Sequence, residues 1–196
     1  MPYISIILLL FLKNLYGPLL ALPVFFDKLK TLLMNINKTY STVQLVSLVA
    51  LRMIVGWHIL YEGVSKMLLP NWTSANFLNE SQWILSGVAH WIVSNSAVLN
   101  AVDFLNIWGL IAIGLGLILG LFTRTASIAG ALLVFLYYLN NAPIIGIEYS
   151  VPTEGSYLIV SKTLIEAVAL FVLYLFPTGK IIGLDAFISR YFNKTK

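Results

Sequence analysis

The chain has 196 residues, of which 59% are hydrophobic and 10% are Asp, Glu, Lys or Arg, and its mean hydropathy is +0.89. Because soluble domains carry about 25% charged residues, this composition excludes an ordinary soluble domain and predicts one integral membrane domain. The net charge of +4 does not indicate nucleic-acid binding, since the basic residues form no patch interleaved with aromatic side chains.

Residues 1–40 contain two short apolar runs, at 4–12 and 19–26, which Lys13, Pro18 and Pro23 interrupt. Neither run reaches the roughly 18 residues expected of a membrane span. No basic segment precedes the first run, so a signal peptide is not predicted. Two interpretations stay open: a short additional hydrophobic segment at the membrane interface, or a translation start at Met34 with an over-extended gene start before it.

Four later segments are apolar enough to be predicted as membrane spans, and together they predict an all-α, integral membrane four-helix bundle. The connection 67–105 is rich in tryptophan, and its segment 82–93 is too short to span, so it is expected to lie at the interface. Proline and glycine predict a loop at 140–157, and residues 188–196 form a basic tail. The predicted spans are residues 42–62, 107–122, 126–139 and 158–176.

The distribution of basic residues predicts the orientation of these spans. Lysine and arginine precede the first span, occupy the turn at Arg124 and recur in the tail, whereas 67–105 and 140–157 contain none. Cytoplasmic loops are enriched in these residues. Both termini are therefore expected in the cytoplasm, with the two long loops outside, which in a bacterium describes a multi-pass inner-membrane protein with a periplasmic face.

The first predicted span carries an unusual set of ionisable residues. Charge is costly in a lipid-facing helix, so these side chains are expected to face protein or water. Gly56 and Gly63 lie on the face of Arg52 and would let another backbone approach closely. Arg52 and Glu166 have similar predicted depths in spans one and four, which predicts an ion pair between them.

His58, Glu62 and Lys66 follow one another at intervals of four residues and so share one helical face. One interpretation is a proton relay to a quinone headgroup, since histidine titrates near neutral pH and carboxylates are tuned by partial burial. The other is a salt bridge between Glu62 and Lys66 with the histidine at the interface. Lys162 stands one turn before Glu166 in the fourth span.

The chain contains no cysteine, which excludes disulfides, thiolate metal sites and iron–sulfur ligation by this chain. Its only histidines, His58 and His90, could ligate a haem, but haem is not favoured because availability alone does not make a site. The sequence has no P-loop, dinucleotide fingerprint or H-E-x-x-H motif, and no metal site is predicted. Any redox role therefore needs a bound cofactor, a quinone or a partner.

Several motifs together resemble the DoxX/DoxD family of membrane proteins over residues 40–187. They are Arg52, Gly56, Gly63 and Lys66 in order, a run G-L-x-L-G-L-F-T-R-x-A-S within 114–127, K-x-x-x-E at 162–166 and G-L-D at 183–185. The resemblance implies a DoxX-like four-helix domain at 41–187. Many relatives carry an acidic residue within the second span, whereas this chain has only Asn106 at its edge.

Because DoxD is the membrane subunit of a thiosulfate:quinone oxidoreductase, the resemblance implies electron transfer from an outside reductant, by analogy thiosulfate, to membrane quinone. In this hypothesis His58, Glu62 and Lys66 handle protons. Arg52 and Glu166, with Lys162 beside them, bind the headgroup in a pocket between spans one and four near the outer leaflet.

The alternative hypothesis is a non-catalytic membrane partner or assembly factor. Its outer loops would dock a periplasmic or membrane protein, which predicts a filled bundle interior and an exposed aromatic patch outside. A transporter is less favoured, because no broken helix or inverted repeat is detected.

Overall fold

The computed structural model describes residues 40–143, 149 and 156–193. The chain divides into two compact units, Met1–Ser41 and Thr42–Lys196. Residues 1–39 lie outside the described residues, and with them nearly all of the predicted segment 1–40. The helices and strands described below all belong to the second unit.

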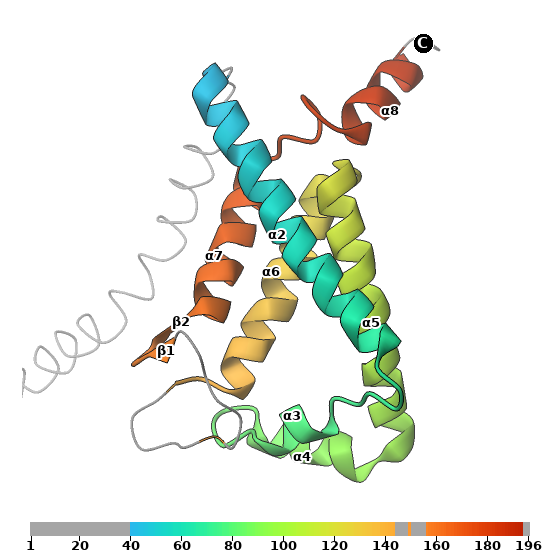
Figure 1. Cartoon of the computed structure of the whole chain (residues 1–196), viewed down its shortest axis with the longest axis vertical. Helices are drawn as coiled ribbons and strands as arrows, with labels where there is room; N and C mark the ends of the chain where they lie inside the picture. The colour runs from blue at the N-terminus through green and yellow to red at the C-terminus, as the bar shows by residue number, and fades with distance from the viewer. Residues whose placement is uncertain (1–39, 144–148, 150–155, 194–196) are drawn as a thin grey trace, which may run out of the picture. The chain divides into compact units, whose positions relative to one another are not determined.

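The described part of the second unit is almost entirely helical, as predicted, with one short antiparallel hairpin before α7 (Figure 1). Two of its helices, α2 and α5, are long and apolar enough to cross a membrane. The elements are α2 (Thr42–Leu68), α3 (Ala75–Asn79), α4 (Ser86–Ser94), α5 (Ser96–Leu119), α6 (Thr123–Asn140), β1 (Ser156–Tyr157), β2 (Val160–Ser161), α7 (Lys162–Leu175) and α8 (Leu184–Asn193).

The helix bounds differ from the predicted spans in two informative places. α2 continues to Leu68, six residues beyond the predicted end of the first span, so Lys66 lies on the helix, as its spacing from His58 and Glu62 predicts. α5 begins at Ser96 instead of residue 107, because Asn95 caps it: its side chain accepts a hydrogen bond from the Val98 amide at 3.3 Å. The polar residues of 96–106 are thus part of a long helix and not of a loop.

The four longest helices pack as two pairs around a shared core. α2 packs mainly on α5 and α6 mainly on α7, while contacts between α5 and α6 and between α2 and α7 join the pairs. Ile59, Leu117 and Leu170 are fully buried in this core. α6 has 18 residues and α7 has 14, so a four-span bundle and the orientation of its termini stay predictions.

Glycines bring α2 and α5 into backbone contact. A Cβ added to Gly56 would lie 2.9 Å from Leu117 Cβ, and one added to Gly114 of α5 would lie 2.6 Å from the Leu60 nitrogen. A Cβ added to Gly63 would lie 2.9 Å from the backbone nitrogen of Ile111 in α5. The predicted close approach at Gly56 and Gly63 is therefore confirmed, and the approaching helix is α5.

A hydrogen-bonded cap joins the start of α6 to α8. Asp185 accepts hydrogen bonds from the amides of Phe122, at 2.7 Å, and Thr123, at 3.0 Å, and from the Thr123 hydroxyl at 2.9 Å. The carboxylate thereby satisfies amides that a helix N-terminus leaves without partners, and its charge complements the helix dipole. Gly120 ends α5 just before this cap with φ of 66°, a left-handed conformation that favours glycine.

Candidate functional site

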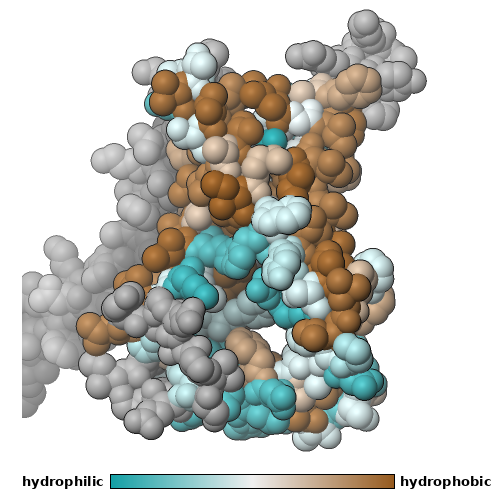
Figure 2. Space-filling model, in the orientation of Figure 1, coloured by the Kyte–Doolittle hydropathy of each residue, from teal (hydrophilic) through white to brown (hydrophobic). Residues whose placement is uncertain are grey.

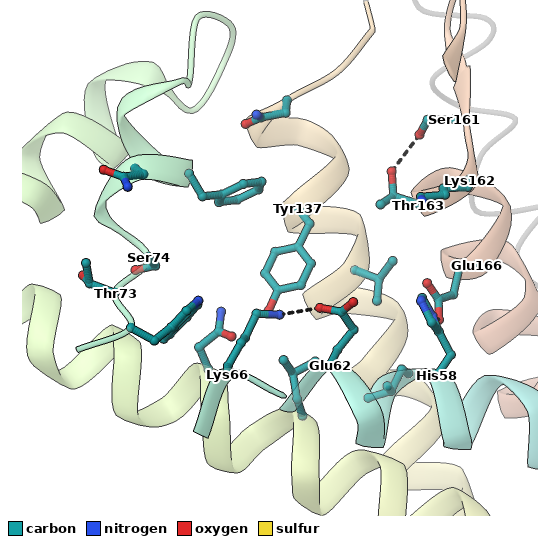
Figure 3. A pocket seen from close by; sticks show the side chains of 18 of the residues that line it. His58, Glu62, Lys66, Thr73, Ser74, Tyr137, Ser161, Lys162, Thr163 and Glu166 are labelled. Carbon is teal, nitrogen blue, oxygen red and sulfur yellow. Dashed lines mark hydrogen bonds and ion pairs between the residues drawn. The ribbon is translucent and has the colours of Figure 1, made fainter. Parts of the chain in front are cut away.

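A half-open cavity of about 870 Å³ lies between α2, α5, α6 and the start of α7, with the segment before α3 forming one wall (Figure 3). Figure 2 shows hydrophilic residues gathered around a hollow on this face, below a largely hydrophobic upper part. The cavity is lined by His58, Ile59, Glu62, Lys66, Asn71, Trp72, Thr73, Ser74, Asn76, Phe77, Asn106, Leu110, Val134, Tyr137, Asn141, Ser161, Lys162, Thr163 and Glu166.

Lys66 and Glu62 form an ion pair on the α2 side of the cavity. Lys66 Nζ donates to Glu62 Oε2 at 2.9 Å, so the predicted salt bridge one turn apart is confirmed. The same Nζ lies 5.8 Å from the ring centroid of Trp72 and 5.9 Å from that of Tyr137, within the range of a cation–π interaction. The ammonium group is thus held among two rings and a carboxylate inside the cavity.

His58 and Glu166 form a second pair, which joins α2 to α7. Their Nδ1 and Oε1 atoms are 2.7 Å apart. The His58 side chain is 53% exposed and that of Glu166 only 15%. The pair therefore has one side open to the surroundings and the other toward the protein.

The predicted ion pair between Arg52 and Glu166 is wrong, because Glu166 pairs with His58 instead. Six helical residues separate Arg52 from His58, which is about 9 Å along the helix axis. α7 begins only at Lys162, later than the predicted start of the fourth span. Depths estimated from span ends were therefore misaligned by more than one helical turn.

Arg52 lies outside the cavity and holds the segment that follows α7. It is 2% exposed, and its Nη1 donates to the Thr178 hydroxyl at 3.0 Å and to the Ile182 carbonyl at 2.9 Å. No described residue accepts a hydrogen bond from its buried Nε. The position of Arg52 assigns it to packing at the α8 end, so its predicted role in binding a headgroup is not supported by the geometry.

The start of α7 supplies the last predicted site residue. Ser161 caps this helix by accepting from the Leu164 amide at 3.3 Å, and its hydroxyl lies 2.7 Å from that of Thr163. Lys162 is exposed at the cavity wall and forms no ion pair with any described residue. Of the six residues predicted for the site, all except Arg52 line the same cavity.

Sequence reasoning missed two polar residues in the cavity wall. The Tyr137 hydroxyl and Asn106 Oδ1 are buried beside each other, and neither forms a hydrogen bond of normal geometry within the described part of the chain. Buried polar atoms usually have partners, so these two atoms identify a place where a ligand could satisfy them. Asn106 was noted only as a polar residue at the edge of the second predicted span, and a tyrosine near the end of a span, such as Tyr137, is typical of an aromatic at the membrane interface.

The wall opposite α7 is tied to the helices. The Ser74 amide and hydroxyl both donate to Asp103 Oδ1 of α5, at 2.9 Å and 2.5 Å. At the end of α6, Asn140 Nδ2 donates to the Phe77 carbonyl at 2.8 Å. These contacts hold the segment 71–77 in place, so the cavity does not depend on an unsupported loop.

Residues 47–139 match the family model DoxX. This range runs from α2 to the end of α6 and includes the wall that contains Lys66 and Tyr137, but not Glu166 or Asp185. No curated protein and no solved structure gives a significant match to the chain.

Proposed function

Through residues 47–139 this chain belongs to the DoxX family of membrane proteins, and we propose that its cavity binds the headgroup of a membrane quinone as part of an oxidoreductase. The observation that carries the proposal is the adjoining pair of buried polar groups, Tyr137 Oη and Asn106 Oδ1, which form no hydrogen bond of normal geometry with any described residue and lie in a cavity flanked by two ion pairs. The tyrosine hydroxyl can donate to a quinone carbonyl oxygen, and the amide oxygen can accept from the hydroxyl of the quinol.

The size and lining of the cavity suit such a headgroup. Small-molecule sites typically have volumes of about 300–1,000 Å³ and combine apolar walls with a few polar groups, and this cavity has about 870 Å³. Trp72, Phe77 and Tyr137 offer aromatic surface, and Lys66 can donate to a carbonyl oxygen. Beside the His58–Glu166 pair, Trp57 is exposed and apolar, which suits a ligand that arrives from lipid.

The two ion pairs could supply the protons of the reaction. Reduction of a quinone to a quinol takes up two electrons and two protons. His58 could release one proton toward the cavity and regain it at its exposed side, and Glu62 with Lys66 could pass the other. The electrons must come from a bound donor or partner, since the chain has no cysteine to hold an iron–sulfur cluster. By analogy the reductant is thiosulfate outside the membrane.

The proposed location is a bacterial inner membrane, crossed four times with both termini in the cytoplasm. The basic residues around Arg124 and in 180–196 support this orientation. It places the cavity at the outer side, because α3 and the start of α7, which help line the cavity, lie at the opposite end of the helices from α8 (Figure 1).

A second candidate function is a non-catalytic partner or assembly factor for a periplasmic or membrane protein. The observation that favours it is an exposed apolar group at α4, formed by Ile84, Val88 and Trp91. This group lies on the predicted outer side, where a partner would dock. The large cavity, with mainly apolar walls and a few polar groups, favours the quinone-binding function over this one.

Titration of the purified chain in lipid nanodiscs with decylubiquinone, followed by the fluorescence of Trp72 and the other tryptophans, tests the proposal. Lys66→Leu should weaken binding about tenfold, equivalent to about 1.4 kcal/mol. Lys180→Leu, which removes an exposed lysine outside the cavity, is the matched control and should bind as the wild type does. Equal affinity in all three proteins would refute quinone binding in this cavity. A stoichiometric outer protein that co-purifies without quinone would favour the second function.

A further inference from the structure

α8 presents an apolar surface that the other described residues leave uncovered. Leu184, Phe187 and Ile188 are exposed, Phe187 by 72%, and the preceding Ile181 and Ile182 are also exposed. We call these five residues the α8 apolar surface. α8 lies at the opposite end of the long helices from α3, which helps line the cavity (Figure 1), and its apolar surface takes no part in the function proposed above.

Hydrogen bonds fix which face of α8 turns toward the protein. Asp185 is held by the amides of Phe122 and Thr123, and the neighbouring Ala186 is buried, with its amide 3.1 Å from the Gly179 carbonyl. Residues 184, 187 and 188 share the opposite face of a helix. Rotating α8 to bury Phe187 would break the Asp185 cap, so this helix cannot bury its apolar face against the described residues by turning.

The charge around this surface indicates the chemistry of what covers it. Residues 180–196 contain four basic residues and a single acidic one. That acidic residue, Asp185, is already engaged by α6. A short amphipathic helix flanked by lysine and arginine is typical of a segment that lies in the headgroup region of an anionic membrane.

A further exposed apolar residue belongs to the turn that is bonded to α8. Phe122 lies in the turn between α5 and α6, and its amide donates a hydrogen bond to Asp185. Its side chain is exposed. The next basic residue, Arg124, is exposed at the start of α6, with its guanidinium 5.4 Å from the ring centroid of Tyr174. Exposed apolar and basic residues of the turn between α5 and α6 therefore lie at the same end of the long helices as those of α8.

We propose that the α8 apolar surface lies in the headgroup region of an anionic bilayer, with Phe187 and Ile188 inserted and the basic residues near lipid phosphates. α8 is then a lipid-binding element whose rotation is set by the Asp185 cap. The geometry favours a membrane over a protein partner, because basic residues flank the apolar face and the exposed Phe122 belongs to the turn that is bonded to α8.

The lack of cysteine allows a direct test on the full-length chain. Phe187→Cys, labelled with an environment-sensitive dye and reconstituted into vesicles, should show a blue-shifted emission and severalfold stronger quenching by lipid-attached quenchers than Ser189→Cys. Ser189 is the matched control, since it is exposed on the same helix and its hydroxyl bonds the Ala186 carbonyl. Adding phosphatidylglycerol to phosphatidylcholine vesicles should increase the difference between the two positions.

Three results would overturn the proposal. Equal quenching at positions 187 and 189 would show that α8 is not inserted. Quenching that does not respond to phosphatidylglycerol would remove the preference for anionic lipid. A dye at 187 that is exposed to water in vesicles but shielded in native membranes would assign the surface to a protein partner.

Discussion

Replacing Tyr137 with phenylalanine should move stability and ligand affinity in opposite directions. The change removes only the hydroxyl, which is buried beside Asn106 without a hydrogen bond of normal geometry to any described residue, and keeps the ring that faces Lys66 and Phe77. Burying an unsatisfied polar group costs about 1–3 kcal/mol. Tyr137→Phe should therefore raise the free energy of unfolding of the ligand-free protein by about 1 kcal/mol.

The same hydroxyl should contribute to binding. A neutral hydrogen bond is worth about 0.5–1.5 kcal/mol, which corresponds to a change of up to about tenfold in affinity. The quinone-analogue affinity of Tyr137→Phe should fall by that factor. Unfolding in detergent and titration in nanodiscs measure the two quantities separately.

The neighbouring Tyr138 provides the matched control. Its hydroxyl donates to the Ile159 carbonyl at 2.8 Å, and it does not line the cavity. Tyr138→Phe should therefore lower the free energy of unfolding by about 1 kcal/mol and leave affinity unchanged. If Tyr137→Phe destabilises the protein as much as Tyr138→Phe, or binds the analogue as tightly as the wild type, the argument from the unpartnered hydroxyl fails.

Three further substitutions test other parts of the structure. Asp185→Ala should lower the free energy of unfolding by about 2 kcal/mol, since it leaves the start of α6 uncapped; an unchanged melting temperature would contradict this role. Gly114→Ala should cost about 2 kcal/mol or more by forcing α2 away from α5, whereas Gly109→Ala, where nothing lies within 4 Å of an added Cβ, should be neutral or slightly stabilising. Glu166→Gln should cost less than about 1 kcal/mol because its partner His58 is half exposed, yet it should slow quinone reduction; unchanged turnover would exclude the pair from proton transfer.

Contacts within one helix could be predicted from the sequence, and contacts between helices could not. The ion pair of Glu62 and Lys66 follows from helical periodicity alone, because residues four apart are neighbours on any α-helix. The partner of Glu166 depends on where α7 begins and on how α2 crosses it. Neither the start of α7 nor this crossing can be deduced from the lengths of the predicted spans. Arg52 was therefore predicted as the partner of Glu166 in place of His58.

The residues missed by sequence reasoning share a physical cause. In the sequence, Tyr137 is a tyrosine near the end of an apolar segment, which is typical of an aromatic at the membrane interface. Only the packing of the helices shows that its hydroxyl is buried without a hydrogen bond of normal geometry. Asp185 was noticed within the G-L-D motif, but its role depends on a long-range contact with Phe122 and Thr123. The start of α5 could have been found, since Asn95 followed by Ser96 is a recognisable helix-capping sequence.

The contact between α2 and α5 at Gly56 and Gly114 has a mechanical consequence. Because the backbones of α2 and α5 are packed at this distance, neither helix can shift or tilt against the other without a steric clash. The two helices therefore move as one rigid unit. Any change in the width of the cavity then has to come from movement of α6 and α7 relative to the unit formed by α2 and α5. At one end of this unit, Arg52 is hydrogen-bonded to Thr178 and Ile182 in the segment after α7, so that end would act as the hinge. The distance between α2 and α7 would increase at the exposed contact of His58 with Glu166.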